Sequence, residues 1–445
     1  MPRRLLFLFL LLSTTAAHAA TYYVSTSGTA ASPGTIERPL RTIASAIRRL
    51  KAGDQIYVRQ GRYRETVTIW QLNGGENAPI RISPFRGEKV IVDGSGSKSN
   101  GVFVIGRSSY IHLDGFEVTN GRNAGIYVYD SHHINVRENT VHDCNHGGIN
   151  ANSSDESPFG TTHDILISGN TVFHCVLSNK ARNNDEQVWM QGVAAYRADR
   201  VEISNNYVYE NYGEGIDYIL SDRGTIRGNR IHDNYSINLY LDNAQSTTVD
   251  SNLIWCSAGN EFYRGGAPAA GIGSANERYP EQNPLNDLTI SNNVVLRCHA
   301  GFSYGSYERG GGLHNTVITN NVFYATNYAA VWIQGRGHDS TIVANNVLYQ
   351  KYGRAYASVP SSGIAFRNNS WFGGGDPSTI VKSTGDITAD PMLTNPGGGE
   401  PKDYQLKAGS PLIDAGTNAG TVPNDYFGTA RAGRGKARDI GIHEY

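Results

Sequence analysis

The chain has 445 residues and a formal charge of −1, so it carries no strong electrostatic attraction to nucleic acid or to an anionic membrane. Glycine accounts for 51 residues and charged side chains for only 18% of the chain, a balance typical of an all-β protein with many tight turns. No glycine-rich phosphate loop stands between a strand and a helix, so we expect no organic cofactor.

The N-terminus reads MPRRLLFLFLLLSTTAAHAA and has the three parts of a secretory signal peptide. Two arginines precede an apolar run, Leu5–Leu12, and small residues form a cleavage site near residues 19–20. The apolar run is too short to span a bilayer, and no later stretch is long enough. We therefore assign residues 1–20 to a signal peptide and expect a secreted or periplasmic protein.

The segment TIASAIRRL, residues 42–50, predicts an amphipathic helix. Such a helix could cover the N-terminal end of a stacked β-domain, where unpaired backbone would otherwise be exposed.

A short pattern built on asparagine recurs from residue 139 onward. Its strings include VRENTV, ISGNTV, ISNNYV, IRGNRI and VDSNLI, and its asparagines are Asn139, Asn170, Asn206, Asn229, Asn252, Asn293, Asn321, Asn346 and Asn369. The base period is about 23 residues, and a unit of that length cannot bury its own apolar residues. Stacking with parallel pairing buries them and lets the asparagines hydrogen-bond along the stack.

This repeat predicts an all-β, single-stranded parallel β-helix of about 10–12 coils over residues 21–390, with the helix of residues 42–50 as its N-terminal cap. The last stretch, residues 391–445, loses the period and is interpreted as a C-terminal cap or appendage.

The four cysteines follow the same register. Cys144 and Cys175 each come five residues after a ladder asparagine, while Cys256 and Cys298 come four and five residues after theirs. Stacked positions lie about 4.8 Å apart, which is near the Cα separation that a disulfide accepts. Disulfides 144–175 and 256–298 are therefore hypotheses, with plain buried thiols as the alternative.

Two segments resemble known proteins. The opening YYVSTSGTAASPGTIERPLRTIASAI with AGDQIYVRQGRYRETVTI, and the ending AGSPLIDAGTNAG through ARDIGIHEY, look like secreted bacterial right-handed β-helix proteins such as the pectate lyase family nine and chondroitinase B groups of polysaccharide lyases. The resemblance implies a right-handed helix and, for these lyases, Ca²⁺ held by acidic residues with a Lys or Arg as base. No ligand set of those families can be matched here residue by residue.

Long insertions interrupt the repeat around the coils of Asn206 and Asn229. They are SSDESPFGTT, LSNKARNNDEQVWMQ, SAGNEFYRGGAPA, NERYPEQNPLND and SYERGGG, and they predict walls around a groove. Strand alternation points Asp217 outward, and from the next coil Asn238, Tyr240 and Asp242. We expect Asp217 to lie beside Asn238, with Ala194 on its other side and Glu214 at the preceding turn.

The acidic residues of this groove have three readings. Asp217, Asn238 and Asp242 could bind Ca²⁺ through hard oxygen ligands. Glu214, Asp217 and the more distant Glu277 could instead supply the acid and the nucleophile or base of a glycosidase. They could also be solvated polar residues on an exposed sheet face.

Basic and aromatic residues complete the predicted site. Lys180 and Arg264 are candidates for a lyase base, and arginines of these loops could pair with substrate carboxylates. The predicted substrate contacts are Asn150, Tyr196, Asn238, Tyr240, Arg182 and Arg278. Trp189 could be a loop contact, and His142 and His232 fit a column of outer aromatic rings. Ordinary solvated loop charges remain the alternative for the basic residues.

Together these features favour a secreted, monomeric polysaccharide lyase that cleaves an acidic, uronic-acid-containing glycan by β-elimination. The alternatives are a glycoside hydrolase that uses Glu214, Asp217 or Glu277, a C5 epimerase, and a non-catalytic glycan-binding surface protein.

Overall fold

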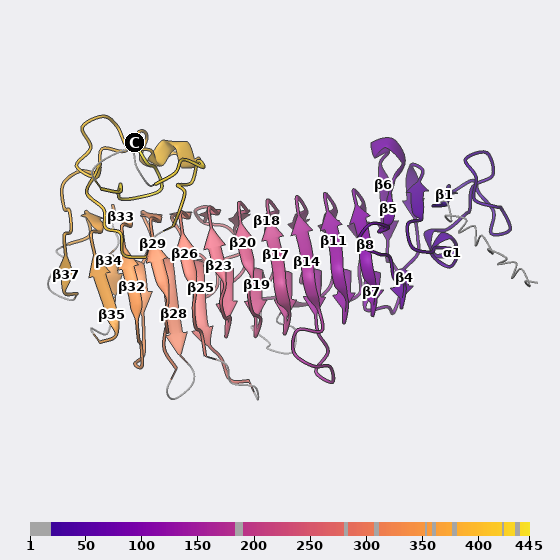
Figure 1. Ribbon diagram of the computed structural model, residues 1–445, viewed down its shortest axis with the longest axis horizontal. Coiled ribbons are helices and arrows are strands. Elements are labelled where there is room, and N and C mark those ends of the chain that lie inside the picture. Colours follow the sequence, from indigo (N-terminus) through magenta and orange to yellow (C-terminus); the bar gives the residue numbers. More distant parts are fainter. Residues whose placement is uncertain are drawn as a thin grey trace, which may run out of the picture.

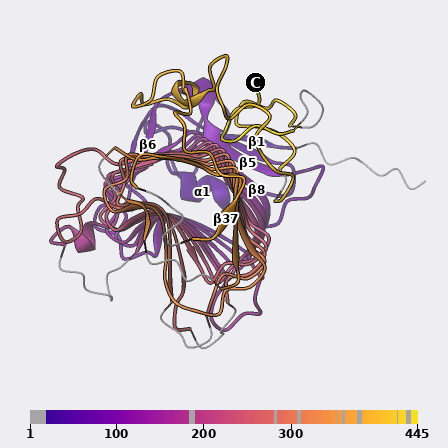
Figure 2. The ribbon, with the colours of Figure 1, turned by 90° about the vertical axis from the view of Figure 1, so that its left-hand side faces the viewer.

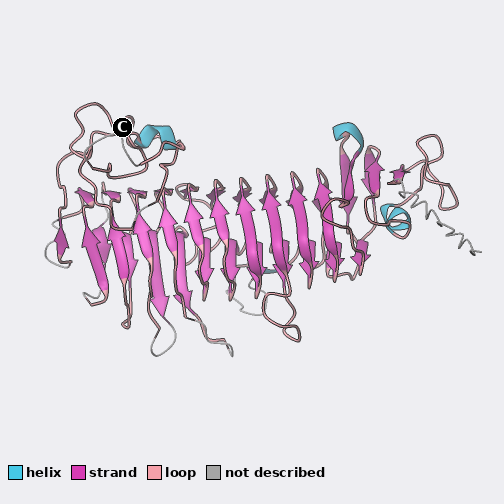
Figure 3. Cartoon of the chain, viewed as in Figure 1, coloured by secondary structure: helices cyan, strands magenta, loops and turns pink. Residues whose placement is uncertain are grey.

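The computed structural model describes residues 19–182, 190–279, 284–306, 311–351, 354–357, 362–375, 381–420, 422–431 and 437–445. The regular structure in this part of the chain is almost entirely β-strand, wound into one elongated coil (Figures 1 and 3). Three parallel sheets of 14, 12 and 11 described strands, here named A, B and C, run along it. This arrangement confirms the predicted parallel β-helix. None of the described helices is long and apolar enough to cross a membrane.

Each full coil passes through one strand of each sheet, in the order A, B, C. Sheet A consists of β1 (Thr21–Val24), β2 (Gln55–Val58), β5 (Ile80–Pro84), β8 (Ser109–Asp114), β11 (His132–Arg137), β14 (His163–Ser168), β17 (Asp199–Ser204), β20 (Thr225–Arg227), β23 (Thr248–Asp250), β26 (Thr289–Ser291), β29 (Val317–Thr319), β32 (Thr341–Ala344), β35 (Ile364–Arg367) and β37 (Ser383–Thr384). Sheet B consists of β3 (Gly61–Tyr63), β6 (Val90–Asp93), β9 (Glu117–Thr119), β12 (Thr140–His142), β15 (Thr171–Phe173), β18 (Tyr207–Tyr209), β21 (Arg230–His232), β24 (Leu253–Trp255), β27 (Val294–Leu296), β30 (Val322–Tyr324), β33 (Val347–Tyr349) and β36 (Ser370–Phe372). Sheet C consists of β4 (Val67–Trp70), β7 (Gly101–Gly106), β10 (Ala124–Tyr129), β13 (Gly147–Asn152), β16 (Gln191–Tyr196), β19 (Glu214–Ile219), β22 (Ile237–Asp242), β25 (Ala270–Asn276), β28 (Ala300–Ser306), β31 (Ala329–Ile333) and β34 (Arg354–Ala357). The short helices are α1 (Ile43–Ile47), η1 (Phe85–Gly87), η2 (Leu177–Asn179) and η5 (Pro401–Tyr404).

The turn from sheet A to sheet B explains the repeated asparagines. The residue before each ladder asparagine has a left-handed backbone, as at Asn205 (φ 56°) and Gly228 (φ 64°), which asparagine and glycine tolerate best. The asparagine that follows points inward. Asn206 Nδ2 donates to Asn229 Oδ1 over 3.0 Å, and Asn229 Nδ2 donates to Asn252 Oδ1 over 2.9 Å. The same bond recurs between successive members from Asn139 to Asn369, so the predicted ladder is confirmed.

The core is a stack of aliphatic side chains inside the coil. Along sheet C, one inward column passes through the fully buried residues Ile149, Val193, Ile216, Leu239 and Ile272. Successive side chains of a strand point to opposite faces, so the next residue of each strand lies on the outer face of sheet C. That outer face carries the candidate site.

Helix α1 closes the N-terminal end of the coil, as predicted, although it is shorter than residues 42–50. Thr42 caps it by accepting a hydrogen bond from the Ser45 N–H (3.2 Å). The Glu65 carboxylate accepts from the other two free N–H groups of the first turn, those of Ile43 and Ala44. Its apolar residues are buried against the first strands, and α1 lies at the centre of the cross-section when the coil is viewed end-on (Figure 2).

The C-terminal segment packs along the side of the coil, over the outer face of sheet B (Figures 1 and 2). Its buried residues Leu393, Tyr404, Leu406, Leu412, Ile440 and Ile442 cover outward apolar residues of strands β24, β27, β30 and β33. The predicted signal peptide falls on residues 1–18, outside the described residues, and on the two that follow, so it stays a prediction.

The cysteines divide into two pairs with different states. Cys256 and Cys298 form a disulfide with Cα atoms 4.9 Å apart, which confirms that hypothesis. The hypothesis of a 144–175 disulfide is not met, because both residues are free buried thiols. Cys144 Sγ lies 3.5 Å from the His142 oxygen and Cys175 Sγ lies 3.6 Å from the Phe173 oxygen, and the two thiols also interact with each other.

We therefore expect two reactive thiols per chain when the denatured, unreduced protein is labelled, since Cys144 and Cys175 are free and become exposed on unfolding. The variant Cys256→Ser should raise the number to three by releasing Cys298. Mass spectrometry of the labelled chain gives the count directly. Four labels on the unsubstituted chain would contradict the disulfide, and none would contradict the free pair.

Candidate active site

The candidate site is a groove on the outer face of sheet C, with long connections at both edges. The described parts of the connections before β16 and β25 (residues 174–182, 190 and 256–269) stand at the edge where the strands begin. The described parts of the connections after β13, β25 and β28 stand at the edge where the strands end, and Figure 1 shows coloured loop segments projecting from that lower side. The predicted insertions thus border the face that carries Asp217.

One of the two predicted strand neighbours of Asp217 differs in the structure. Asp217 of β19 is paired with Ala194 of β16, as expected, but its partner on β22 is Tyr240 and not Asn238. Asn238 is fully buried and faces inward, and Ile237 lines an outer cavity. Alternation holds from Leu239 onward but fails at the start of β22, where the chain turns the corner from sheet B into sheet C.

A second ladder of asparagines explains the position of Asn238. Asn211 Nδ2 donates to Asn234 Oδ1 over 2.8 Å, and Asn234 Nδ2 donates to Asn238 Oδ1 over 3.0 Å. Asn238 Nδ2 in turn lies 3.3 Å from the sulfur of Cys256. The predicted roles of Asn238 in metal binding and substrate binding are therefore wrong, because its side chain is committed to the interior.

Four carboxylates gather on the outer face of the neighbouring strands. They are Glu214, Asp217, Asp242 and Glu277, and we refer to them as the acid cluster. Asp217 is only 1% exposed, Glu214 and Asp242 are 4% exposed, and Glu277 is half-buried.

Three polar side chains hold the acid cluster in place. The Tyr240 hydroxyl donates to Glu277 Oε1 over 2.7 Å, and the Tyr279 hydroxyl donates to Asp242 Oδ2. Gln191 Nε2 donates to Glu214 Oε2 over 3.3 Å. The backbone N–H of Glu277 donates to Asn243 Oδ1 over 2.7 Å, which fixes the start of the loop that follows β25.

Burial and repulsion from neighbouring carboxylates raise the pKa of two members of the acid cluster. Burial raises the pKa of Asp217 well above its ordinary value, and the nearby Glu214, Asp242 and Glu277 carboxylates raise it further. Burial likewise raises the pKa of Asp242 to about 8, against the opposing hydrogen bond from Tyr279. The charges that act on both groups come from other carboxylates. Both effects favour the protonated forms of Asp217 and Asp242.

Calcium coordination by the predicted set does not fit this geometry. Asp217 Oδ1 and Asp242 Oδ1 are buried and have no hydrogen-bond partner among the described residues, as metal ligands could. However, Asn238 faces the interior. In the described part of the chain, only one group of three His, Cys, Asp or Glu residues brings its ligand atoms within 4.8 Å of one another, and it lies on sheet A. Calcium binding by the acid cluster stays an untested prediction.

A cavity of about 280 Å³ adjoins the acid cluster on the same face. Tyr240 belongs to both, since its hydroxyl binds Glu277 while its ring lines the cavity. Small residues, Gly273 and Ser303, lie between the larger Tyr240 and Trp332 along the column that continues from Asp217. This column offers aromatic rings separated by open floor, an arrangement that suits the faces of sugar rings.

Two polar groups converge on the cavity. Arg264, from the loop before β25, lines it and donates to Ser236 Oγ over 2.9 Å. His299 lines it too and stacks on Tyr328 at 5.3 Å, and its Nδ1 atom is buried without a partner among the described residues.

The remaining predicted residues take other positions. Asn150 lies on the same outer column as Asp217, two strands away, and the Tyr196 hydroxyl donates to Asp155 Oδ1 over 2.8 Å. Lys180 stands over the ring of Tyr212 at 5.7 Å, and Arg182 donates to the carbonyl of Glu261, which ties two loops together.

Arg278 is exposed directly after Glu277, and Trp189 lies outside the described residues. As predicted, His142 and His232 belong to a stack of rings with Phe173, Tyr209 and Trp255 on the outer face of sheet B.

Sequence reasoning missed Tyr279, Gln191, His299 and Trp332. Gln191 and Trp332 could have been found by extending the outward columns of Glu214 and Asp217 to earlier and later strands. Tyr279 and His299 lie outside the strands, so alternation gives no signal for them.

Comparison with known proteins assigns the fold to a family. Residues 22–252 match the model of the family described as "Pel9A-like, right handed beta helix region", which covers more than half of the chain. Residues 160–348 also match the broader "Right handed beta helix region".

Individual proteins are more distant. Pectate lyase PEL9 of Emericella nidulans is 32% identical over 127 residues, which are 25% of this chain and 31% of that protein, so the match spans about a third of its length. The structure of XylC in complex with xylose superposes with a TM-score of 0.63 at 14% identity, over 95% of this chain and 98% of that chain. Pectate lyase Pel9A superposes with a TM-score of 0.55 at 16% identity, over 96% of each chain. These superpositions establish a shared right-handed β-helix.

Proposed function

Since the chain belongs to the family of Pel9A-like right-handed β-helix proteins, we propose that it is a carbohydrate-active enzyme that cleaves a glycan in the groove of sheet C. The acid cluster is the reaction centre of this proposal, and the cavity lined by Tyr240, Arg264 and Trp332 is the neighbouring sugar subsite.

The observation that carries the proposal is a pair of buried carboxyls with raised pKa, Asp217 and Asp242, in a cluster that Tyr240 joins to a cavity of about 280 Å³. A carboxyl that keeps its proton at neutral pH can act as a general acid, and a second carboxylate close by can stabilise or attack the anomeric carbon. We assign the acid to Asp242 and the second role to Glu277, which is the most exposed member of the cluster and is oriented by Tyr240.

The cleavage step follows from these roles. The Asp242 proton moves to the glycosidic oxygen, the bond from that oxygen to the anomeric carbon breaks, and Glu277 faces the positive charge that develops on the sugar. Water completes the reaction by adding to the anomeric carbon and giving up a proton to a carboxylate. Glu214 helps to keep the proton on Asp242, because its negative charge raises the pKa of Asp242.

The charges of the site favour hydrolysis over β-elimination. Elimination needs a group that neutralises a uronate and a base that removes its C5 proton. The charged groups that raise the pKa of Asp217 and Asp242 are carboxylates, which would repel a uronate placed at the acid cluster unless a positive group stood beside it. A neutral sugar is not repelled in this way.

A polysaccharide lyase is the second candidate, and two observations favour it. The relative from Emericella nidulans, which is 32% identical over 127 residues, is a pectate lyase. Arg264 also lines the cavity, where it could pair with a uronate carboxylate. In this candidate the substrate is an acidic polysaccharide, and calcium at the acid cluster would neutralise it.

The products distinguish the two chemistries. We expect the purified mature protein to release reducing ends from a neutral glycan without forming the absorbance of unsaturated uronate, and to do so equally with Ca²⁺ and with chelator. The panel should contain neutral glycans together with pectate, alginate, chondroitin, heparin and hyaluronan. Unsaturated-uronate absorbance on an acidic polymer, lost with chelator, would contradict hydrolysis and establish the lyase.

A further inference from the structure

A second group of reactive side chains lies on sheet A, where strands β11 and β14 begin. His132 pairs in register with His163, and the next residues are His133 and Asp164. Both of these next residues have a left-handed backbone, with φ of 54° and 53°. A left-handed residue changes the direction of the side chains around it, and here two consecutive side chains of each strand are partly exposed.

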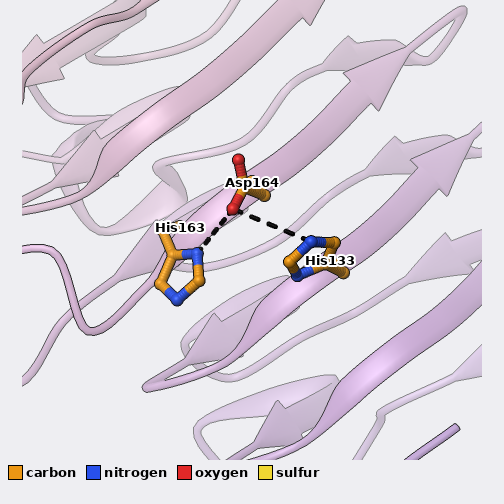
Figure 4. A group of neighbouring side chains, drawn as sticks. All are labelled: His133, His163 and Asp164. Carbon is orange, nitrogen blue, oxygen red and sulfur yellow. Dashed lines mark hydrogen bonds and ion pairs between the residues drawn. The ribbon is translucent and has the colours of Figure 1, made fainter. Parts of the chain in front are cut away.

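The ligand atoms of three of these residues converge (Figure 4). One atom each from His133, His163 and Asp164 lie within 4.8 Å of one another. Asp164 Oδ2 is 2.7 Å from His163 Nδ1 and 3.8 Å from His133 Nε2. His132 adds a third imidazole to this group, because its Nδ1 is 2.9 Å from His133 Nδ1 and its ring stacks on His163 at 4.9 Å.

A cavity of about 370 Å³ opens beside this group. His133 and Asp164 line it, together with Arg81, Tyr110, His112 and Asn135. A metal held by His133, His163 and Asp164 would therefore stand at the wall of a polar cavity. Three protein ligands with one position left for water or another small ligand is the arrangement that zinc uses in open sites.

We propose that His133, His163 and Asp164 form a binding site for a late first-row transition-metal dication such as Zn²⁺, with the remaining coordination facing the adjacent cavity. Imidazole nitrogens with one carboxylate select these metals over Ca²⁺ and Mg²⁺, which prefer oxygen ligands alone. The site lies on a different sheet from the acid cluster and shares no residue with it. The proposal does not depend on the proposed glycan cleavage.

The guanidinium of Arg200 is the positive charge that pairs with Asp164 in this group. Its Nε and Nη2 atoms donate to the two Asp164 oxygens over 2.7 and 2.8 Å, and Nη2 is 3.3 Å from His163 Nδ1. Arg200 also pairs with Asp199, which would retain the guanidinium when a metal takes over Asp164. Metal and Arg200 therefore compete for the same carboxylate, and this competition gives the site a directional test.

The test is a calorimetric titration of the mature protein with Zn²⁺ near neutral pH. We expect one Zn²⁺ per chain, and affinity at least about tenfold weaker in His133→Ala and in His163→Ala, because each removes a ligand. Arg200→Gln should bind Zn²⁺ more tightly than the unsubstituted protein, since it frees Asp164. Titration with Co²⁺ provides an independent readout, because its visible absorption reports coordination by the protein.

The matched control is His112→Ala, which removes a histidine from the same cavity but not from the converging group. Thermal melting verifies that each variant is folded. The proposal is overturned if Zn²⁺ does not bind, if both ligand variants bind it as tightly as the unsubstituted protein, or if His112→Ala weakens binding as much as they do. Weaker binding in Arg200→Gln would also overturn it, since the arginine would then be helping rather than competing.

Discussion

Replacing Asp242 with asparagine is expected to lower the rate of glycan cleavage by at least about 100-fold, the usual contribution of a general acid. Asparagine preserves the size of the side chain and can still accept the hydrogen bond from Tyr279 through its amide oxygen. It has no proton to transfer. The loss should therefore appear in kcat while the affinity for the glycan changes little.

The pH dependence follows from the pKa of Asp242, which is about 8 in the folded protein. Activity should fall as pH rises through about 8, because Asp242 then loses the proton that it donates. In the unfolded chain the same group ionises near pH 4. Between these values the folded protein holds a proton that the unfolded chain has released, so Asp242 makes the protein less stable as pH rises from about 4 to 8.

Asp242→Asn is therefore expected to melt at a higher temperature than the unsubstituted protein, with a gain that is small at pH 4 and larger at pH 8. The matched control is Asp114→Asn, the same chemical change on sheet A, where Asp114 pairs with Arg137. It should preserve activity and show no such gain at high pH. Full activity in Asp242→Asn would remove this residue from the mechanism, and an equal gain at both pH values would contradict its protonation.

Replacing Asn229 with alanine is expected to destabilise the coil by about 3 kcal/mol or more, because it leaves several buried polar groups without partners at about 1–3 kcal/mol each. Asn229 Nδ2 donates to the Ile203 carbonyl and to Asn252 Oδ1, both over 2.9 Å. Asn229 Oδ1 accepts from the N–H of Asn206 and from its side chain, over 2.9 and 3.0 Å. Alanine satisfies none of these groups, and water has no access to the site.

Denaturant unfolding followed by circular dichroism measures the effect as a lower midpoint. Arg227→Ala is the control on the same coil, because Arg227 is exposed and its ion pair with Glu202 contributes at most about 1 kcal/mol. If both variants unfold at the same midpoint, the asparagine ladder does not stabilise the stack as the buried hydrogen bonds imply.

The coil, its direction of stacking and the outward position of Asp217 could be predicted from the sequence. A period of about 23 residues leaves each unit unable to bury its own apolar side chains, so stacking follows from the repeat itself. Alternation along the strand then places Ile216 and Tyr218 on the inner face and Asp217 on the outer face, without any knowledge of neighbouring coils. The register also placed Cys256 and Cys298 close enough for a disulfide, although it did the same for Cys144 and Cys175.

Other features depend on how the coils meet, and alternation within one strand cannot supply them. The sequence predicts that Asn238 points outward as a ligand. The corner before β22 instead directs its side chain inward, where it joins a second asparagine ladder. The free state of Cys144 and Cys175 depends on where the sulfurs point, which register alone does not determine.

The raised pKa of Asp242 comes first from burial and then from Glu277, which the loop after β25 brings to it, while the hydrogen bond from Tyr279 of the same loop lowers this pKa. The His133, His163 and Asp164 group likewise forms only because residues about 30 positions apart stack between adjacent strands, at about the 4.8 Å spacing of a β-sheet. The sequence by itself therefore determined the repeat and the two faces of each strand. Only the tertiary structure decided which side chains of different coils are neighbours, because burial, charge repulsion and ligand geometry act across coils rather than along the chain.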